Sequence, residues 1–78
     1  METVLIVEDD RVYARTTTNW LVRNGINARY VLSVDAAKEF LDNHDVDLVL
    51  SDFRLNNGNG VELLEWMNTH GYRILSSS

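Results

Sequence analysis

The sequence contains no cysteine and no proline, and only four of its 78 residues are glycine. Without cysteine, disulfide bonds and thiolate-bound metal sites are excluded, so a chain this short must be stabilised by packing, by a partner or by a cation. Basic residues are also few: seven lysines and arginines stand against twelve acids, which gives a net charge of -5. Because the bases are scattered singly along the chain, we expect no direct binding to nucleic acid.

Long apolar runs are absent as well. No segment approaches the roughly 20 apolar residues that span a bilayer, and the first ten residues, METVLIVEDD, lack the basic start and the small-residue cleavage site of a signal peptide. We therefore expect a cytoplasmic protein that does not enter a membrane. With 45% hydrophobic and 24% charged residues, the composition is typical of a soluble globular chain. Its length predicts one small domain or a piece of one.

Short apolar runs alternate with segments of helical periodicity. The runs predict strands at residues 4–7, 28–32, 47–51 and 72–75. A first helix is predicted over residues 11–24, a second begins after Ser33 or Asp35 as its N-cap, and a third runs from Val61 to the stop at Gly71. Strands that alternate with helices imply right-handed crossovers and a parallel sheet with helices on both faces. The predicted fold class is therefore α/β.

Acidic residues follow two of the predicted strands. Glu8 and Asp9 come directly after residues 4–7, and Asp52 comes directly after residues 47–51. Because parallel strands all end at the same edge of the sheet, we expect these three side chains to converge. Neighbouring carboxylates repel one another, so this group of acids needs a cation or shared protons, and a hard divalent cation is the simpler of the two. Mg²⁺ suits such a site, since it prefers oxygen ligands and retains several waters.

Each acid also has an ordinary structural explanation. Asp9 or Asp10 could cap the first helix, and Asp52 could belong to a turn. We favour a site because two acidic strand ends occur together in the architecture that places ligands at strand ends.

Three segments, VLIVEDD, DLVLSDFRL and GNGVELLEWM, resemble the receiver domain of two-component response regulators, and the resemblance runs from about Thr3 to Tyr72. It implies a flavodoxin-like doubly wound parallel sheet with strand order 2-1-3-4-5. A complete receiver has five strand-helix units, whereas the resemblance here ends within the fourth strand. Residues 1–75 therefore resemble a C-terminally truncated receiver domain, and residues 76–78 a disordered or foreign serine tail. Whether Ser76 or Ser77 stands for the hydroxyl that ends strand four stays open.

The resemblance implies a role for each residue at the sheet edge. Asp52 matches the aspartate that accepts a phosphoryl group from a histidine kinase or a phosphotransfer protein. Asp9 matches the direct magnesium ligand, and Glu8 matches a second ligand that acts directly or through water. Arg54 matches the residue whose backbone carbonyl completes the metal site. No catalytic residue beyond Asp52 is implied, so we expect a phosphoprotein of phosphorelay signal transduction that is not itself an enzyme.

Other functions are compatible with parts of this pattern. A receiver-like interaction module without phosphotransfer stays open as an alternative. A fragment of an aspartate-nucleophile phosphatase is less favoured, because such enzymes usually carry a second acid two residues on, where this chain has Arg54. A flavodoxin-like cofactor binder is disfavoured, because Glu8 and Asp9 stand where it needs a phosphate-binding loop.

The shortened fold predicts an incompletely covered surface. Without the last helix, apolar residues of the first and third strands are expected to be exposed, and the last strand becomes an unprotected edge. We therefore expect the chain to self-associate. Among the remaining conspicuous residues, Trp20 and Trp66 are expected to pack against the core, and His44 and His70 to lie at helix ends, away from the acids.

Overall fold

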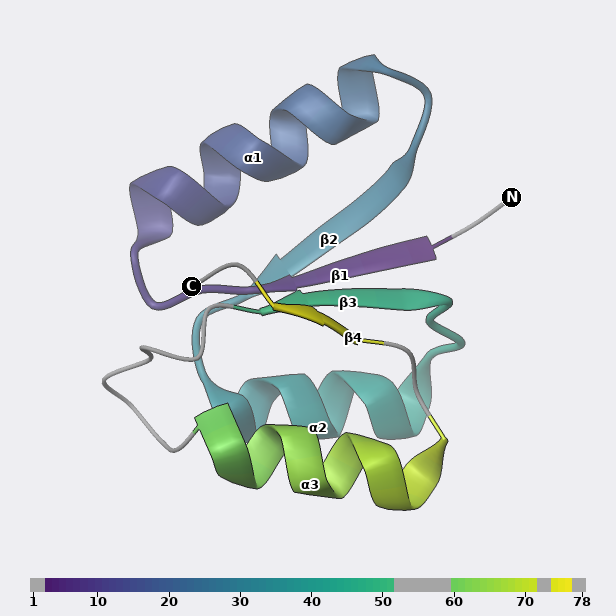
Figure 1. Cartoon of the computed structure of the whole chain (residues 1–78). Helices are drawn as coiled ribbons and strands as arrows, with labels where there is room; N and C mark the ends of the chain where they lie inside the picture. The colour runs from purple at the N-terminus through teal and green to yellow at the C-terminus, as the bar shows by residue number, and fades with distance from the viewer. Residues whose placement is uncertain (1–2, 52–59, 72–73, 77–78) are drawn as a thin grey trace.

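The computed structural model describes residues 3–51, 60–71 and 74–76 of the chain. In this part, four strands alternate with three helices, as the sequence predicts (Figure 1). The strands are β1 (Thr3–Val7), β2 (Asn27–Val31), β3 (Leu48–Ser51) and β4 (Ile74–Ser76). The helices are α1 (Arg11–Arg23), α2 (Val34–Asn43) and α3 (Gly60–His70). No helix of the described residues combines the length and the apolar character that crossing a membrane requires.

The strands form one parallel sheet in the order β2-β1-β3-β4. β1 pairs with β2 on one side, from Thr3 opposite Asn27 onward, and with β3 on the other side. The α/β class and the order of the first four strands are therefore confirmed. Because β1 has a strand on each side and helices on both faces, Val4–Val7 is buried throughout, which explains its unbroken apolar sequence.

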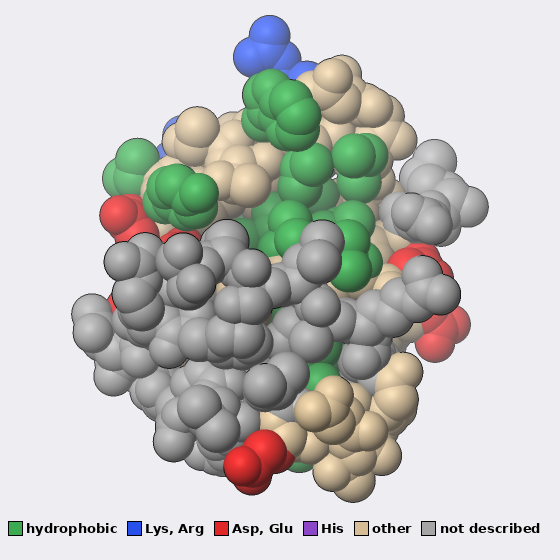
Figure 2. Space-filling view, viewed as in Figure 1, with side chains coloured by type: hydrophobic (Ala, Val, Ile, Leu, Met, Phe, Trp, Pro, Cys, Tyr) green, Lys and Arg blue, Asp and Glu red, His purple; other side chains and the backbone are tan. Residues whose placement is uncertain are grey.

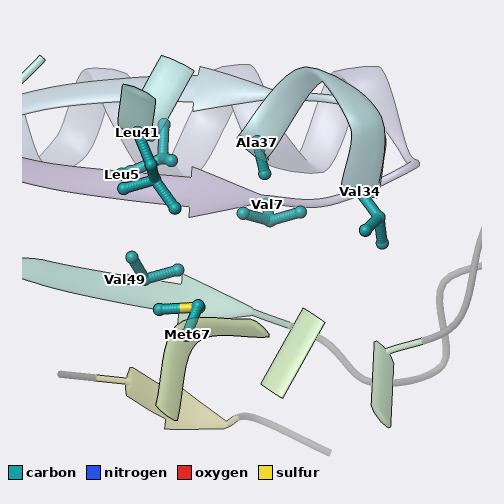
Figure 3. Packing of buried hydrophobic residues seen from close by; sticks show 7 residues of the cluster. All are labelled: Leu5, Val7, Val34, Ala37, Leu41, Val49 and Met67. Atoms are coloured by element: carbon teal, nitrogen blue, oxygen red, sulfur yellow. The ribbon is translucent and has the colours of Figure 1, made fainter. Parts of the chain in front are cut away.

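Helices cover both faces of the sheet: α1 lies on one face, and α2 and α3 lie side by side on the other (Figure 1). The main core fills the space between the sheet and the α2/α3 pair. Figure 3 shows its members, which are Leu5, Val7, Val34, Ala37, Leu41, Val49 and Met67. Along β1 and β3, the residues of this core alternate with residues that point to the α1 face, because successive side chains of a strand point to opposite faces of the sheet. This core is what holds the ends of β1 and β3 in place.

A smaller core lies under α1. Its buried members are Val4, Ile6 and Ala28, with half-buried leucines at positions 48 and 50 packed against them. The expectation that β1 would be exposed on this face is wrong, because α1 covers it. β3 remains only half-buried on the α1 side, since one helix covers less of a four-stranded sheet than two do.

Local hydrogen bonds explain where the helices begin and end. The Ala36 N–H donates to Oγ of Ser33 at 3.1 Å, so Ser33 is the N-cap of α2 and Asp35 lies within its first turn. Gly25 follows α1 with a φ of +84°, and Gly71 follows α3 with a φ of +78°. Both glycines adopt the left-handed conformation that commonly ends a helix.

Element boundaries differ from the predicted ones by a residue or so. Asp47 was expected in the third strand but instead precedes it: its Oδ2 accepts a hydrogen bond from the Thr3 N–H at 2.7 Å. β2 starts one residue earlier than predicted and ends at Val31. β4 extends to Ser76, one residue into the predicted serine tail, whereas residues 77–78 lie outside the described part.

One expected packing residue is exposed. Trp20 is 62% exposed, whereas Trp66 is half-buried and packs against the main core as predicted. In α1 the buried positions facing the sheet are Ala14 and Thr18, and Leu21 is half-buried beside them. Trp20 is about 100° around the helix from Leu21, which carries it off this face.

Thr18 is a buried residue of α1 whose hydroxyl has no hydrogen-bond partner within the part of the chain that the structure describes. We expect Thr18→Val to raise the free energy of unfolding by about 1 kcal/mol, because it replaces an unsatisfied buried hydroxyl with a methyl group of similar size. Urea denaturation measures the change. Thr16→Val is the matched control: Thr16 is exposed on the same helix, so its substitution should change stability by less than about 0.5 kcal/mol.

Candidate functional site at the carboxyl edge of the sheet

The acidic pair Glu8 and Asp9 lies directly at the carboxyl end of β1. The Glu8 N–H donates to the carbonyl oxygen of Val31 at 3.1 Å, so the ladder between β1 and β2 extends one residue past the strand. Glu8 is 7% exposed and Asp9 is half-buried. A carboxylate as buried as that of Glu8 requires compensating partners. The two acids are therefore held at the sheet edge by β1.

Asp10 holds the turn between β1 and α1 through three hydrogen bonds. The Asp10 N–H donates to Oε1 of Glu8 at 3.1 Å. Asp10 in turn accepts from the Tyr13 N–H at its Oδ1 (3.2 Å) and from the Ala14 N–H at its carbonyl oxygen (2.9 Å). These contacts identify Asp10 as the N-cap of α1. The sequence left Asp9 or Asp10 as the candidate for this cap, and the structure assigns it to Asp10.

Replacing this cap should weaken α1 measurably. We expect Asp10→Ala to lower the free energy of unfolding by about 1 kcal/mol, because the Tyr13 N–H loses its acceptor. Asp10→Ser retains a capping oxygen and should lose only a small part of that amount. Chemical denaturation of the three proteins at one fixed concentration checks the ranking. If Asp10→Ser were as unstable as Asp10→Ala, the negative charge would matter here and the hydrogen bond would not.

The end of β3 lies beside the end of β1. Val7 pairs with Ser51, so the last strand residue before Glu8 and the last before Asp52 are neighbours in the sheet. Ser51 is 1% exposed. The predicted convergence is thus confirmed for the two strand ends. Asp52 and Arg54 themselves lie outside the described residues.

No cluster of three or more His, Asp or Glu side chains is arranged to hold a metal within residues 3–51, 60–71 and 74–76. The predicted ligand set draws two of its four members, Asp52 and Arg54, from residues beyond these ranges. The other two predicted ligands, Glu8 and Asp9, lie within the described residues and present carboxylate oxygens at the carboxyl edge of the sheet. This donor chemistry suits a hard cation such as Mg²⁺.

The family model of the response regulator receiver domain matches residues 4–76. The chain belongs to this family. Two-component response regulator ORR8 of Oryza sativa, in both subspecies indica and japonica, is 37% identical over 62 residues, which cover 78% of this chain and 51% of that protein. The chain therefore spans about half the length of the curated relatives it matches.

Solved receiver structures share the fold. The MaeR response regulator bound to beryllium trifluoride is 28% identical with a TM-score of 0.87, and the match covers 99% of this chain and 66% of that one. A response regulator receiver protein from Pseudomonas putida is 22% identical with a TM-score of 0.93, covering 99% and 67%. The second likeness supports the fold alone. Together with the sheet order, these matches confirm the flavodoxin-like α/β architecture that the sequence predicts.

The two histidines of the receiver domain lie at helix ends, as the sequence predicts. His44 Nδ1 lies 3.1 Å from the carbonyl oxygen of Phe40, and its ring stacks on that of Phe40 with the ring centroids 4.1 Å apart. His70 repeats the arrangement with Trp66, its Nδ1 2.8 Å from the carbonyl oxygen. Each histidine thus satisfies a carbonyl at the end of its own helix. These contacts explain both residues as helix-terminating groups.

Proposed function

We propose that this receiver domain accepts a phosphoryl group on Asp52 from a histidine kinase or a phosphotransfer protein. The observation that carries the proposal is the pairing of Val7 with Ser51, which sets the acidic pair next to the strand end that precedes Asp52. Membership of the receiver family supports the same role. A phosphorelay of this kind places the protein in the cytoplasm, and the chain acts in it as a substrate and a switch.

Mg²⁺ is the cofactor that fits this role. We infer that Asp9 and Asp52 would ligate it through carboxylate oxygens, that the backbone carbonyl of Arg54 would add a third ligand, and that Glu8 would act directly or through water. When bound, the ion would neutralise charge on the acids and on the incoming phosphoryl oxygens. The described contacts give Asp10 a structural role and leave it out of the proposed ligand set. Asp10 caps α1, and its N–H donates to the Glu8 carboxylate.

The chain's own residues would perform the transfer as follows. An Oδ of Asp52 attacks phosphorus in line with the leaving nitrogen of a phosphohistidine; the new O–P bond forms as the P–N bond breaks. The nitrogen keeps the electron pair and takes up a proton from solvent. Because Glu8 is buried at the end of β1, its carboxyl group is held at a set position near the reaction. Phosphorylation then shifts an equilibrium between surface conformations, as a charge-changing modification can do.

An interaction module without phosphotransfer is the second candidate, because the comparisons establish the family and not the chemistry of this chain. A phosphatase is less favoured because Arg54 stands where a second acid is needed. One experiment separates the three: intact-mass spectrometry and phosphate assay after incubation with acetyl phosphate, with Mg²⁺ or with a chelator. We expect one covalent phosphoryl group per chain, dependent on Mg²⁺. Multiple-turnover phosphate release would indicate a phosphatase, and the absence of any adduct would leave the interaction module.

A further inference from the structure

A second hollow lies at the amino edge of the sheet, the edge opposite Glu8 and Asp9. It has a volume of about 200 Å³, and residues of β1, β2 and the end of α2 line it. These residues are Thr3, Asn27, Arg29, Phe40, His44 and Asp45. Figure 2 shows apolar side chains gathered over α1 and on the sheet beneath it, whereas this hollow is mostly polar and lies on the α2 face. β2 is the strand farthest from β4 in the sheet.

Hydrogen bonds hold the walls of the hollow in place. On the sheet side, Nδ2 of Asn27 donates to Oγ1 of Thr3 at 3.1 Å, and the Thr3 N–H donates to Oδ2 of Asp47 at 2.7 Å. On the helix side, the His44 ring stacks on Phe40 with an angle of 13° between the two rings. Walls fixed in this way give a preformed cavity, which is the usual form of a small-molecule site.

Opposite charges line the hollow. Ala28 points into the small core under α1, so its neighbour Arg29 points to the α2 face, where the hollow lies. Asp45 follows the end of α2. Neither Arg29 nor Asp45 makes a hydrogen bond or an ion pair in the described part of the chain, with each other or with another residue. The hollow therefore offers a guanidinium on the sheet side and a carboxylate on the helix side.

The helix side also presents a second hydrogen-bond acceptor. The carbonyl of Phe40 can only accept, so the neutral His44 ring carries its proton at Nδ1 and leaves a lone pair at Nε2. The last turn of α2 has no basic residue, so the partial negative charge of the helix end is not offset within this helix. A cationic group is therefore favoured beside His44 and Asp45, and an anionic group is favoured beside Arg29.

We propose that this hollow binds a free α-amino acid as its zwitterion. The carboxylate of the ligand accepts two parallel N–H bonds from Arg29, and its ammonium donates to Asp45 and to Nε2 of His44. An apolar side chain of the ligand lies against the stacked rings of Phe40 and His44. The volume suits this class, because a cavity of about 150 Å³ accommodates benzene.

The charges disfavour other small ligands. A phosphate or a dicarboxylate would pair with Arg29 but would meet the carboxylate of Asp45, and the chain as a whole carries a net charge of -5. A metal ion would meet the guanidinium of Arg29. A zwitterion satisfies both charges and adds none. Binding at this edge requires neither Asp52 nor Mg²⁺, so it is independent of the proposed function.

Two-dimensional ¹H–¹⁵N NMR of the whole chain, titrated with L-phenylalanine to about 10 mM, tests the proposal. We expect saturable shifts at the amides of Thr3, His44 and Asp45, with a dissociation constant of roughly 0.1–1 mM for a ligand this small. The amides of Glu8 and Asp9, at the opposite edge, should stay unchanged. Two analogues separate the charges: N-acetyl-L-phenylalanine lacks the ammonium, and L-phenylalanine amide lacks the carboxylate. Each should bind at least about 10-fold more weakly.

Matched variants locate the binding site. Arg29→Gln removes the guanidinium and should weaken L-phenylalanine binding at least about 10-fold, whereas Arg15→Gln removes an exposed arginine of α1 and should leave the affinity unchanged. Asp45→Asn should weaken L-phenylalanine binding while leaving that of N-acetyl-L-phenylalanine unchanged or stronger. The spectra themselves confirm that each variant is folded.

Several results would overturn the proposal. These are the absence of saturable shifts at about 10 mM, shifts confined to other parts of the chain, affinity retained in Arg29→Gln, or an equal loss in Arg15→Gln. Binding of either analogue as tight as that of L-phenylalanine would also overturn it, because the two charges of the zwitterion would then not be recognised.

Discussion

Replacing Asp52 by asparagine should abolish covalent phosphorylation of the chain by acetyl phosphate. The amide has nearly the shape of the carboxylate but lacks the anionic oxygen that attacks phosphorus, so the nucleophile is lost while the fold is retained. We expect intact-mass spectrometry to show one phosphoryl adduct on the wild type in Mg²⁺ and none on Asp52→Asn. Because a nucleophile cannot be replaced by its neighbours, the expected effect is a complete loss.

Two further variants show whether the acidic pair acts as proposed. Asp9→Asn retains Asp52 but weakens the metal site, and the rate of adduct formation should fall by roughly 100-fold at a limiting Mg²⁺ concentration. Asp10→Asn is the matched control, because asparagine caps a helix as well as aspartate does and Asp10 is assigned to the cap. Its rate should stay close to that of the wild type. An adduct that persists in Asp52→Asn would place the acceptor elsewhere.

Leu5→Ala should bring the chain close to unfolding. Leu5 is 0% exposed and lies in the main core, in contact with both the α2/α3 side and the sheet (Figure 3). Truncating a fully buried leucine costs about 3–4 kcal/mol, through the lost burial and the cavity that remains. At 0.05–0.15 kcal/mol per residue, a chain of this length is stabilised by only about 4–12 kcal/mol. Urea denaturation followed by circular dichroism should show the midpoint falling by at least about a quarter, and by nearly all of its value if the wild type lies at the lower end of this range.

The control for this effect is Val12→Ala, since Val12 is the most exposed of the large apolar residues described, at 74%. It lies in α1, where alanine has the higher helix propensity, so stability should stay the same or rise by a few tenths of a kcal/mol. The wild type and the two variants are compared at one fixed protein concentration and in one buffer. A Leu5→Ala protein within about 1 kcal/mol of the wild type would show that the core relaxes around the cavity.

Much of the fold could be predicted from the sequence, because strands and helix ends depend on the types of a few neighbouring residues. The run Val4–Val7 is apolar at every position, which only a strand buried on both faces requires. Ser33 and Gly71 carry the residue types that begin and end helices. The prediction that Trp20 packs against the core is wrong because burial on α1 is not decided locally. This helix has several apolar residues around its circumference, and the flank that meets the sheet depends on how the helix docks.

The candidate site also combines residues that the sequence identifies with contacts that only the folded chain shows. The acids that follow two strands indicate a cation site, because parallel strands end at one edge. Which of Asp9 and Asp10 caps α1 could not be predicted, since both precede the helix and both carry a side chain suited to an N-cap. The hydrogen bond from the Tyr13 N–H to Oδ1 of Asp10, seen only in the folded chain, assigns the cap to Asp10.

By itself, the sequence determined the order of the elements, the fold class, the family and the identity of the candidate site residues. These follow from residue type and spacing, which act over a few neighbouring positions along the chain. Only the tertiary structure decided that Val7 and Ser51 stand side by side, that Asp10 caps α1, and that the Trp20 flank of α1 is left exposed. Each of these depends on contacts between residues distant in the chain or on the docking angle of a helix, and the free energy of such contacts is set by packing that no local pattern records.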